Sequence, residues 1–241
     1  MKRCKTAKFI GLFVYFFFYL INSEFAIGEN QTKYILSNLE NALNDRDLKT
    51  INNYFEKAEG LKITNQFTNL IEDFPNSIWQ ITYKDSIKKD NDFFEVNLIG
   101  TKILDGKELI LESNFDYYFA ISNGKIKNGQ IKNLLTIIRN DDEFIDFEIN
   151  IPDTVLSGSN YHLDIIINTP LGDQIYAGAL APHQQNSIIE QNIFLEPLLA
   201  GGMFKVTRAP NKAGIQIWSG IIAHPKGLVT FTKTVEIVDK F

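Results

Sequence analysis

Cysteine is nearly absent from this sequence, whose 241 residues include only Cys4. Cys4 precedes the apolar run of an expected N-terminal leader, whereas the lipid-bearing cysteine of a lipoprotein would follow that run. Cleavage of the leader would remove it, so we expect a mature chain with no disulfide, no thiolate nucleophile and no cysteine metal site. Its hydrophobic cores alone must then stabilise it, which favours a bacterial envelope compartment over an animal extracellular space.

Histidine is also scarce, and the three histidines are His162, His183 and His224. A zinc site needs three or four converging ligands, and these residues show neither His-x-His nor His-Glu-x-x-His spacing. Gly201-Gly202 opens a strand and is too short for a phosphate-binding loop. Ser157-Gly158-Ser159 lacks the Gly-x-Ser-x-Gly elbow of a hydrolase. We therefore expect no metal, no cofactor and no catalytic residue, and we favour a protein that is not an enzyme.

The first 26 residues have the three-part pattern of a secretory signal peptide. A basic segment at residues 2–8 is followed by an apolar run at residues 9–21 and by small or polar residues at 22–26. Crossing a membrane takes about 20 apolar residues, so this run is short. We predict a cleaved signal peptide over residues 1–26 and a location in the periplasm or another envelope compartment. A retained N-terminal membrane anchor is the alternative.

Basic residues are fewer than acidic residues in the rest of the chain. Removal of residues 1–26 takes away four basic residues and one acidic residue, which changes the formal net charge from −5 to −8. A chain this acidic, without a basic stripe, is a poor nucleic-acid binder. It would also be repelled by an anionic membrane surface, so we expect neither partner beyond the leader itself.

The pattern of the first half changes from helix to strand. Apolar residues at helical spacing predict helices over residues 34–43, 48–55 and 67–74. From Trp79 onward the apolar residues alternate with polar ones, which predicts antiparallel strands. The turns between these strands are predicted from Asn-Gly and Asp-Gly pairs: Asp105-Gly106, Asn123-Gly124 and Asn128-Gly129.

Three helices followed by a curved antiparallel sheet resemble the NTF2-like (SnoaL-like) α+β cone fold. The segment 39–48 (LENALNDRDL) resembles the first helix pair of that family. The resemblance covers about residues 30–139 and sets a first domain at 27–139. It implies a cone-shaped cavity that serves as an enzyme pocket, a ligand site or plain core, and a sheet that could pair face to face in a homodimer. The aromatic candidates for lining this pocket are Trp79, Tyr83, Tyr117 and Phe119.

Enzymes that this domain resembles carry an Asp–His or Asp–Tyr pair inside the cone. No histidine precedes His162, so an Asp–His pair is excluded there. Asp116 and Tyr118 can share one strand face, and on the inner face Asp116 would have a raised pKa and be a general-base candidate. Alternation favours the other arrangement, with Tyr117 and Phe119 facing inward and the acid and phenol facing solvent.

The second half contains only strand patterns. About seven alternating segments separated by Pro/Gly turns fill residues 144–241, and they resemble an immunoglobulin-like or fibronectin-III-like β-sandwich with Trp218 in its core. A short hinge at 140–143 would join the two domains, and we expect the function to lie across both domains or in the groove between them. Gly201-Gly202 is read as a bulge or tight bend entering an edge strand. The functional alternative is contact with an acidic partner by three cations: Lys205, Arg208 and Lys226.

Taken together, the sequence predicts a secreted or envelope-associated two-domain binding or assembly protein. Its expected partner is an envelope protein or a small apolar ligand held in the first domain. The alternative is a SnoaL-like hydrolase, isomerase or cyclase that acts on an apolar small molecule.

Overall fold

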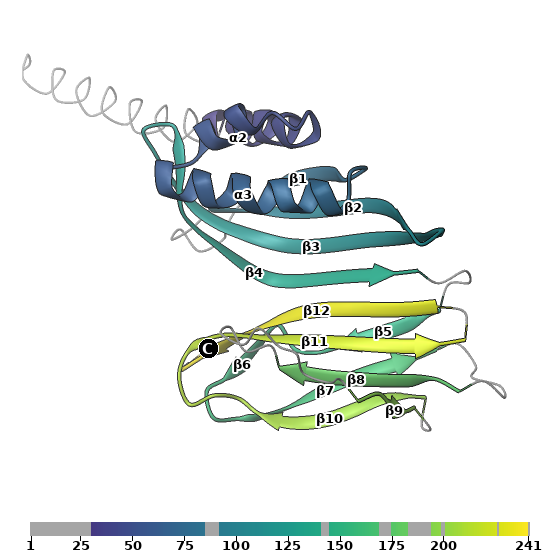
Figure 1. The fold of residues 1–241 in the computed structure, drawn as a ribbon. Coiled ribbons are helices and arrows are strands. Elements are labelled where there is room, and N and C mark those ends of the chain that lie inside the picture. The colour runs from purple at the N-terminus through teal and green to yellow at the C-terminus, as the bar shows by residue number, and fades with distance from the viewer. Residues whose placement is uncertain are drawn as a thin grey trace, which may run out of the picture.

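The computed structural model describes most of the chain from residue 30 onward (Figure 1). The predicted signal peptide, three of the four hinge residues, His183 and Lys226 lie outside the described residues. The described ranges are 30–84, 92–140, 145–168, 175–182, 194–198, 201–225 and 227–240.

Three helices come first, as the apolar spacing predicts. The first covers residues 30–44, and it is followed by α2 (Leu48–Tyr54) and α3 (Lys57–Asp73). Asp47 caps α2, because its carboxylate accepts a hydrogen bond from the Thr50 backbone nitrogen at 3.1 Å.

Helix α3 begins ten residues before the predicted helix at 67–74. Gly60 reads as a helix stop in the sequence, but it lies inside α3 and is buried. A Cβ atom at Gly60 would approach the Asn52 side-chain oxygen to 2.4 Å. The glycine is therefore required by the close crossing of α2 and α3, and it does not end the helix.

Four long antiparallel strands follow: β1 (Ile78–Lys84), β2 (Asp92–Leu104), β3 (Lys107–Ser122) and β4 (Lys125–Arg139). The predicted turns at Asp105-Gly106 and Asn123-Gly124 are confirmed. All four of these residues have φ between 51° and 77°, which is the conformation that two-residue hairpins require.

The predicted turn at Asn128-Gly129 is wrong, because β4 continues through it. The pairing of β4 with β3 slips at two places, opposite Phe115 and opposite Phe119. An asparagine with positive φ lies at each slip, Asn133 at 52° and Asn128 at 56°. These are β-bulges, which bend and twist the strand that carries them, and β3 and β4 curve beneath the helices (Figure 1).

The second half of the described chain contains eight strands. Three of them, β5 (Phe147–Asn150), β7 (Asn160–Ile167) and β10 (Gly202–Arg208), form a sheet in the order β10-β7-β5. The other five are β6 (Thr154–Leu156), β8 (Ala177–Pro182), β9 (Glu196–Pro197), β11 (Gly214–His224) and β12 (Gly227–Val238). The two layers enclose one core that includes Leu163, Ile165, Trp218, Phe231 and Val235.

One sheet runs through both halves of the molecule. Its order is β1-β2-β3-β4-β12-β11-β8-β9, and β6 pairs with β12 in parallel as the ninth strand. The join is the antiparallel pairing of Leu135–Arg139 with Val229–Lys233. Arg139, read as the last residue before a hinge, is paired on both sides, with Ile110 and with Val229.

The expected NTF2-like α+β cone followed by a separate immunoglobulin-like sandwich is therefore wrong. Strands make up 58% of the structure and helices 22%, and the large antiparallel sheet is shared between the halves. The physical reason is that the last long strand, β12, returns to the free edge of β4. That strand closes the second core while it extends the first sheet.

Candidate site: an apolar cavity between the helices and the sheet

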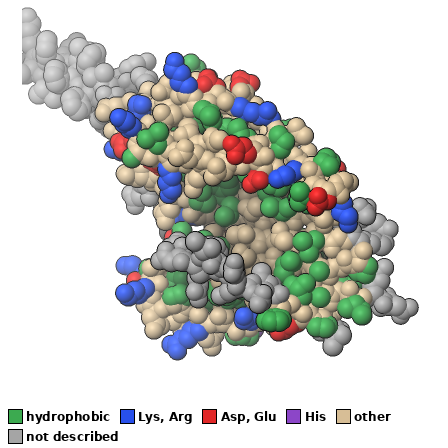
Figure 2. Space-filling view, in the orientation of Figure 1, with side chains coloured by type: hydrophobic (Ala, Val, Ile, Leu, Met, Phe, Trp, Pro, Cys, Tyr) green, Lys and Arg blue, Asp and Glu red, His purple; other side chains and the backbone are tan. Residues whose placement is uncertain are grey.

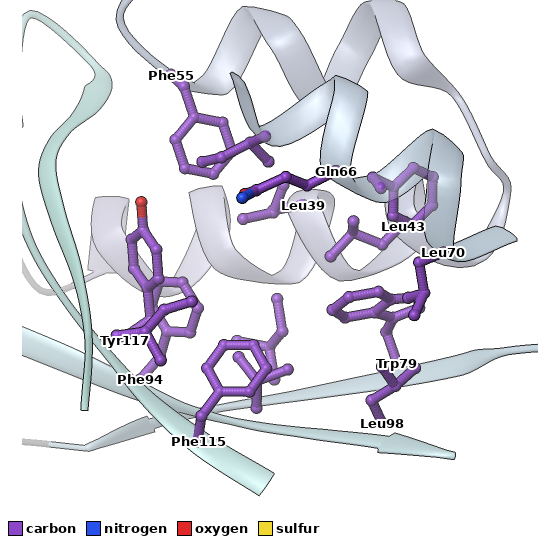
Figure 3. A pocket seen from close by; sticks show the side chains of 15 residues that line it. Leu39, Leu43, Phe55, Gln66, Leu70, Trp79, Phe94, Leu98, Phe115 and Tyr117 are labelled. Atoms are coloured by element: carbon purple, nitrogen blue, oxygen red, sulfur yellow. The ribbon is translucent and has the colours of Figure 1, made fainter. Parts of the chain in front are cut away.

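A cavity of about 260 Å³ lies between the helices and the first four strands (Figure 3). Its wall is almost wholly aliphatic or aromatic. It is lined by Leu39, Leu43, Phe55, Ile63, Gln66, Phe67, Leu70, Trp79, Ile81, Phe94, Val96, Leu98, Phe115, Tyr117 and Ile131.

The two periodicities of the sequence produce this wall. Helix α3 contributes Ile63, Gln66, Phe67 and Leu70, which fall on one face of a helix because they are three or four positions apart. Strand β2 contributes Phe94, Val96 and Leu98, and β3 contributes Phe115 and Tyr117, in both cases at a spacing of two. The helix stripe and the inner face of the sheet meet across the cavity.

Two lining residues are exposed to solvent, so the cavity reaches the surface. Ile131 on β4 is 40% exposed, and Gln66 on α3 is also exposed. The Gln66 side chain extends among the apolar side chains of the wall (Figure 3). Figure 2 shows hydrophobic side chains at the surface just below α3. Gln66 therefore places an amide, with both a donor and an acceptor, beside an apolar interior.

One carboxylate organises the polar end of the cavity. The Tyr117 hydroxyl donates a hydrogen bond to Glu59 Oε1 at 2.8 Å, and the Gly129 backbone nitrogen donates to the same oxygen at 2.8 Å. Glu59 lies in the first turn of α3, where the helix dipole stabilises negative charge. Burial raises the pKa of Tyr117 above its ordinary value, and the hydrogen bond and charge of Glu59 raise it further.

Trp79 lies on the other side of the cavity from Tyr117 (Figure 3). Asn44 fixes its backbone, since the Trp79 nitrogen donates to Asn44 Oδ1 at 2.8 Å and its carbonyl accepts from Asn44 Nδ2 at 2.9 Å. The indole Nε1 is buried and has no hydrogen-bond partner among the described residues. An unpaired buried donor costs about 1–3 kcal/mol.

The four aromatic candidates divide into two pairs. Trp79 and Tyr117 line the cavity. Phe119 is buried in the same core and Tyr83 packs against that core, but neither is part of the cavity wall. Tyr117 stacks on Phe94 with ring centroids 5.0 Å apart.

Asp116 and Tyr118 lie on the opposite face of β3, outside the cavity wall. Asp116 accepts a hydrogen bond from Asn133 Nδ2 at 2.6 Å. Tyr118 stacks on Phe93 at 4.9 Å, and the Lys132 ammonium lies 5.0 Å from its ring centroid. This geometry does not place the acid and the phenol against a molecule held in the cavity.

The same outer face carries a half-buried polar network that sequence reasoning missed. Asn114 Nδ2 donates to Glu95 at 2.9 Å and to Asn97 at 2.7 Å, and Lys84 pairs with Glu95 at 3.0 Å. The hydrogen bonds from Lys84 and Asn114 lower the pKa of Glu95. These side chains satisfy one another, and alternating polar residues on β2 and β3 were the signal for them.

Of the three partner-contact candidates, the structure describes Lys205 and Arg208, and each makes a contact within the protein. Arg208 Nε donates to the Gly158 carbonyl at 2.8 Å and holds a turn. The Lys205 ammonium lies 5.5 Å from the centroid of the buried Trp218 ring, and Lys226 lies outside the described residues. Lys205 also borders a second hollow of about 430 Å³ between β8, β9 and β10.

In the described ranges, no three His, Cys, Asp or Glu side chains converge as a metal site would require. No helix in those ranges combines the length and apolar character needed to span a membrane.

Comparison with known proteins gives one partial similarity and no activity. Residues 142–238 match the family model of a domain of unknown function, DUF8623. The matched part begins just after β4 and ends with β12. A search of curated proteins found no match to the chain.

Sequence reasoning missed Glu59, Gln66 and Gly129. Gln66 falls on the apolar stripe of α3 between Ile63 and Leu70, and a polar residue in such a stripe is a usable signal. Glu59 precedes the segment that was predicted as helix, and Gly129 belongs to a pair that was read as a turn. The positions of Glu59 and Gly129 in the site therefore depend on the full lengths of α3 and β4, which the sequence patterns did not predict.

Proposed function

We propose that this protein is a non-enzymatic binding protein that holds one small, mainly apolar molecule in the cavity between α3 and the curved sheet. The observation that carries the proposal is the cavity itself, about 260 Å³ of apolar space that reaches the surface at Gln66 and Ile131. The signal-peptide pattern of residues 1–26 supports an exported location for this binding.

The size of the cavity indicates the size of the ligand. An apolar cavity of about 150 Å³ binds benzene, and pockets for drug-sized molecules start at about 300 Å³. The cavity of about 260 Å³ suits a molecule of roughly ten non-hydrogen atoms on that scale. The driving force would be apolar burial, with the Gln66 amide available for a polar group of the ligand.

The cavity wall supports binding better than catalysis. Its polar side-chain groups are the Gln66 amide, the Tyr117 hydroxyl and the Trp79 indole. The Tyr117 proton is already donated to Glu59. Asp116 and Tyr118, the acid and phenol named from the sequence, belong to the other face of the sheet.

The test is calorimetric titration of the mature protein with 1-octanol and with naphthalene. We expect one site per chain and a dissociation constant between roughly micromolar and millimolar, given the small size of the ligands. Ile63→Phe places extra volume at a lining position of α3 and should weaken binding at least tenfold. Leu61→Phe on the same helix is the matched control, because Leu61 is 53% exposed and outside the wall.

Two results would refute the proposal. One is the absence of saturable binding by any small apolar compound. The other is equal binding by wild type and Ile63→Phe when circular dichroism shows that the variant is folded.

A further inference from the structure

The hydrogen-bond directions at Tyr117 restrict the chemistry of a ligand. A phenolic hydroxyl has one proton and two acceptor lone pairs. The proton of Tyr117 is donated to Glu59 at 2.8 Å, and that carboxylate oxygen also accepts from the Gly129 nitrogen at 2.8 Å. While this arrangement holds, the Tyr117 oxygen can only accept a further hydrogen bond.

The charge at this end of the cavity disfavours an acidic ligand. None of the described residues that line the cavity is Lys, Arg or His. The carboxylate oxygen of Glu59 lies 2.8 Å from the Tyr117 hydroxyl oxygen. A ligand carboxylate brought to this position would meet a like charge in a partly buried site, where repulsion is stronger than in water.

Close packing holds this arrangement in place. A Cβ atom on residue 129 would lie 1.7 Å from the Tyr117 hydroxyl oxygen and 2.2 Å from Glu59 Oε1. Only glycine lets β4 approach closely enough to donate its backbone N–H to the carboxylate. The acceptor character of Tyr117 is thus built into three elements, α3, β3 and β4.

From this geometry we infer that the ligand of the cavity is a neutral molecule with an apolar body and a terminal hydrogen-bond donor, such as an alcohol hydroxyl, which docks on the Tyr117 oxygen. The inference rests on the proposed function and deepens it. It selects alcohols over ethers, which have no donor to offer, and over carboxylates, which meet the charge of Glu59. Any acceptor atom on the same ligand can use the Gln66 amide.

The experiment compares three ligands by calorimetry on the mature protein at neutral pH. They are 1-octanol, 1-methoxyheptane, which is its isomer without a donor, and octanoate. We expect 1-octanol to bind about fivefold tighter than the ether, the factor that one hydrogen bond supplies. Octanoate should bind at least tenfold more weakly than 1-octanol.

Two substitutions test whether Tyr117 and Glu59 cause these differences in ligand affinity. Tyr117→Phe should lower octanol affinity to the level of the ether and leave ether affinity unchanged. Glu59→Gln removes the charge and should narrow the gap between octanol and octanoate at least threefold.

The outcomes separate the two proposals. If the ether or octanoate binds wild type as tightly as octanol, the inference about the donor is wrong while the binding function stands. If none of the three binds, both are wrong. The comparison of the three ligands on the wild-type protein tests the inference about the donor even if a variant fails to fold.

Discussion

The hydroxyl of Tyr117 on β3 donates a hydrogen bond to Glu59 Oε1 in the first turn of α3, and the two oxygens lie 2.8 Å apart. The same carboxylate oxygen accepts the backbone N–H of Gly129 on β4. One acidic side chain thus ties a helix to two neighbouring strands at the edge of the apolar cavity. Hydrogen bonds to a charged group contribute about 1.5–3 kcal/mol, so we expect this contact to stabilise the fold.

Gly129→Ala should destabilise the protein by about 2–3 kcal/mol. The new methyl group would lie 1.7 Å from the Tyr117 oxygen, so either the strand or the hydrogen bond must move, and overpacking of this kind costs about 1–3 kcal/mol. Urea unfolding followed by circular dichroism measures the change. Gln130→Ala, at the exposed next position, should stay within about 0.5 kcal/mol. Equal midpoints for the two variants would contradict the prediction.

Alkaline pH should destabilise the wild type more than Tyr117→Phe. Burial and the Glu59 contact raise the pKa of Tyr117 above its ordinary value of 10.0. Above about pH 10 the unfolded chain therefore loses a proton that the folded chain keeps, and the free energy of unfolding falls by about 1.4 kcal/mol per pH unit for each such group. Below that pH the contribution is fully present. Urea midpoints at pH 9 and pH 11 test this, and equal losses in both proteins would contradict it.

Local turn chemistry could be predicted from the sequence, but strand pairing could not. Asp105-Gly106 and Asn123-Gly124 are turns because both residues of each pair adopt positive φ. Asn128-Gly129 carries the same signal, yet β3 continues alongside it, so the extra residue becomes a bulge. Whether a pair is a turn or a bulge depends on the neighbouring strand, which the pair itself does not specify.

The pairing of β4 with β12 is the clearest feature of the fold that could not be predicted from the sequence. Thr136 pairs with Thr232, far along the chain, and period-two alternation suits β12 equally well against any partner. Alternation does predict the faces of β3, with Tyr117 toward the helices and Asp116 away from them. It cannot supply Glu59, because that contact depends on where α3 crosses the sheet.

The continuous sheet predicts that both halves of the protein unfold together. The chain has two tryptophans, and the structure places Trp79 beside the cavity and Trp218 in the second core. Trp218→Phe leaves Trp79 as the fluorescent reporter, and Trp79→Phe leaves Trp218. We expect Phe231→Ala, a core truncation in the second half that should cost about 3–5 kcal/mol, to lower the urea midpoint seen by each reporter equally. A Trp79 midpoint that does not move would show that the halves unfold independently.

The second core contains a hydrogen-bond chain whose loss should be costly. Trp218 Nε1 on β11 donates to the Tyr161 hydroxyl on β7 at 2.9 Å, and that hydroxyl donates to Gln216 Oε1 at 2.7 Å. The chain links the two sheets, and Trp218 is only 2% exposed. Tyr161→Phe leaves the indole N–H buried and unpaired, which should cost about 1–3 kcal/mol.

Trp79 offers the matched comparison for this last effect, because its Nε1 already lacks a partner among the described residues. The double variant Tyr161→Phe with Trp218→Phe removes the orphaned donor. It should therefore be less destabilised than the sum of the two single variants in urea unfolding. Trp79→Phe removes no protein hydrogen bond, so combining it with Tyr161→Phe should give additive losses. Additive losses for the Trp218 pair as well would mean that the Tyr161 hydroxyl does not stabilise the second core through Trp218.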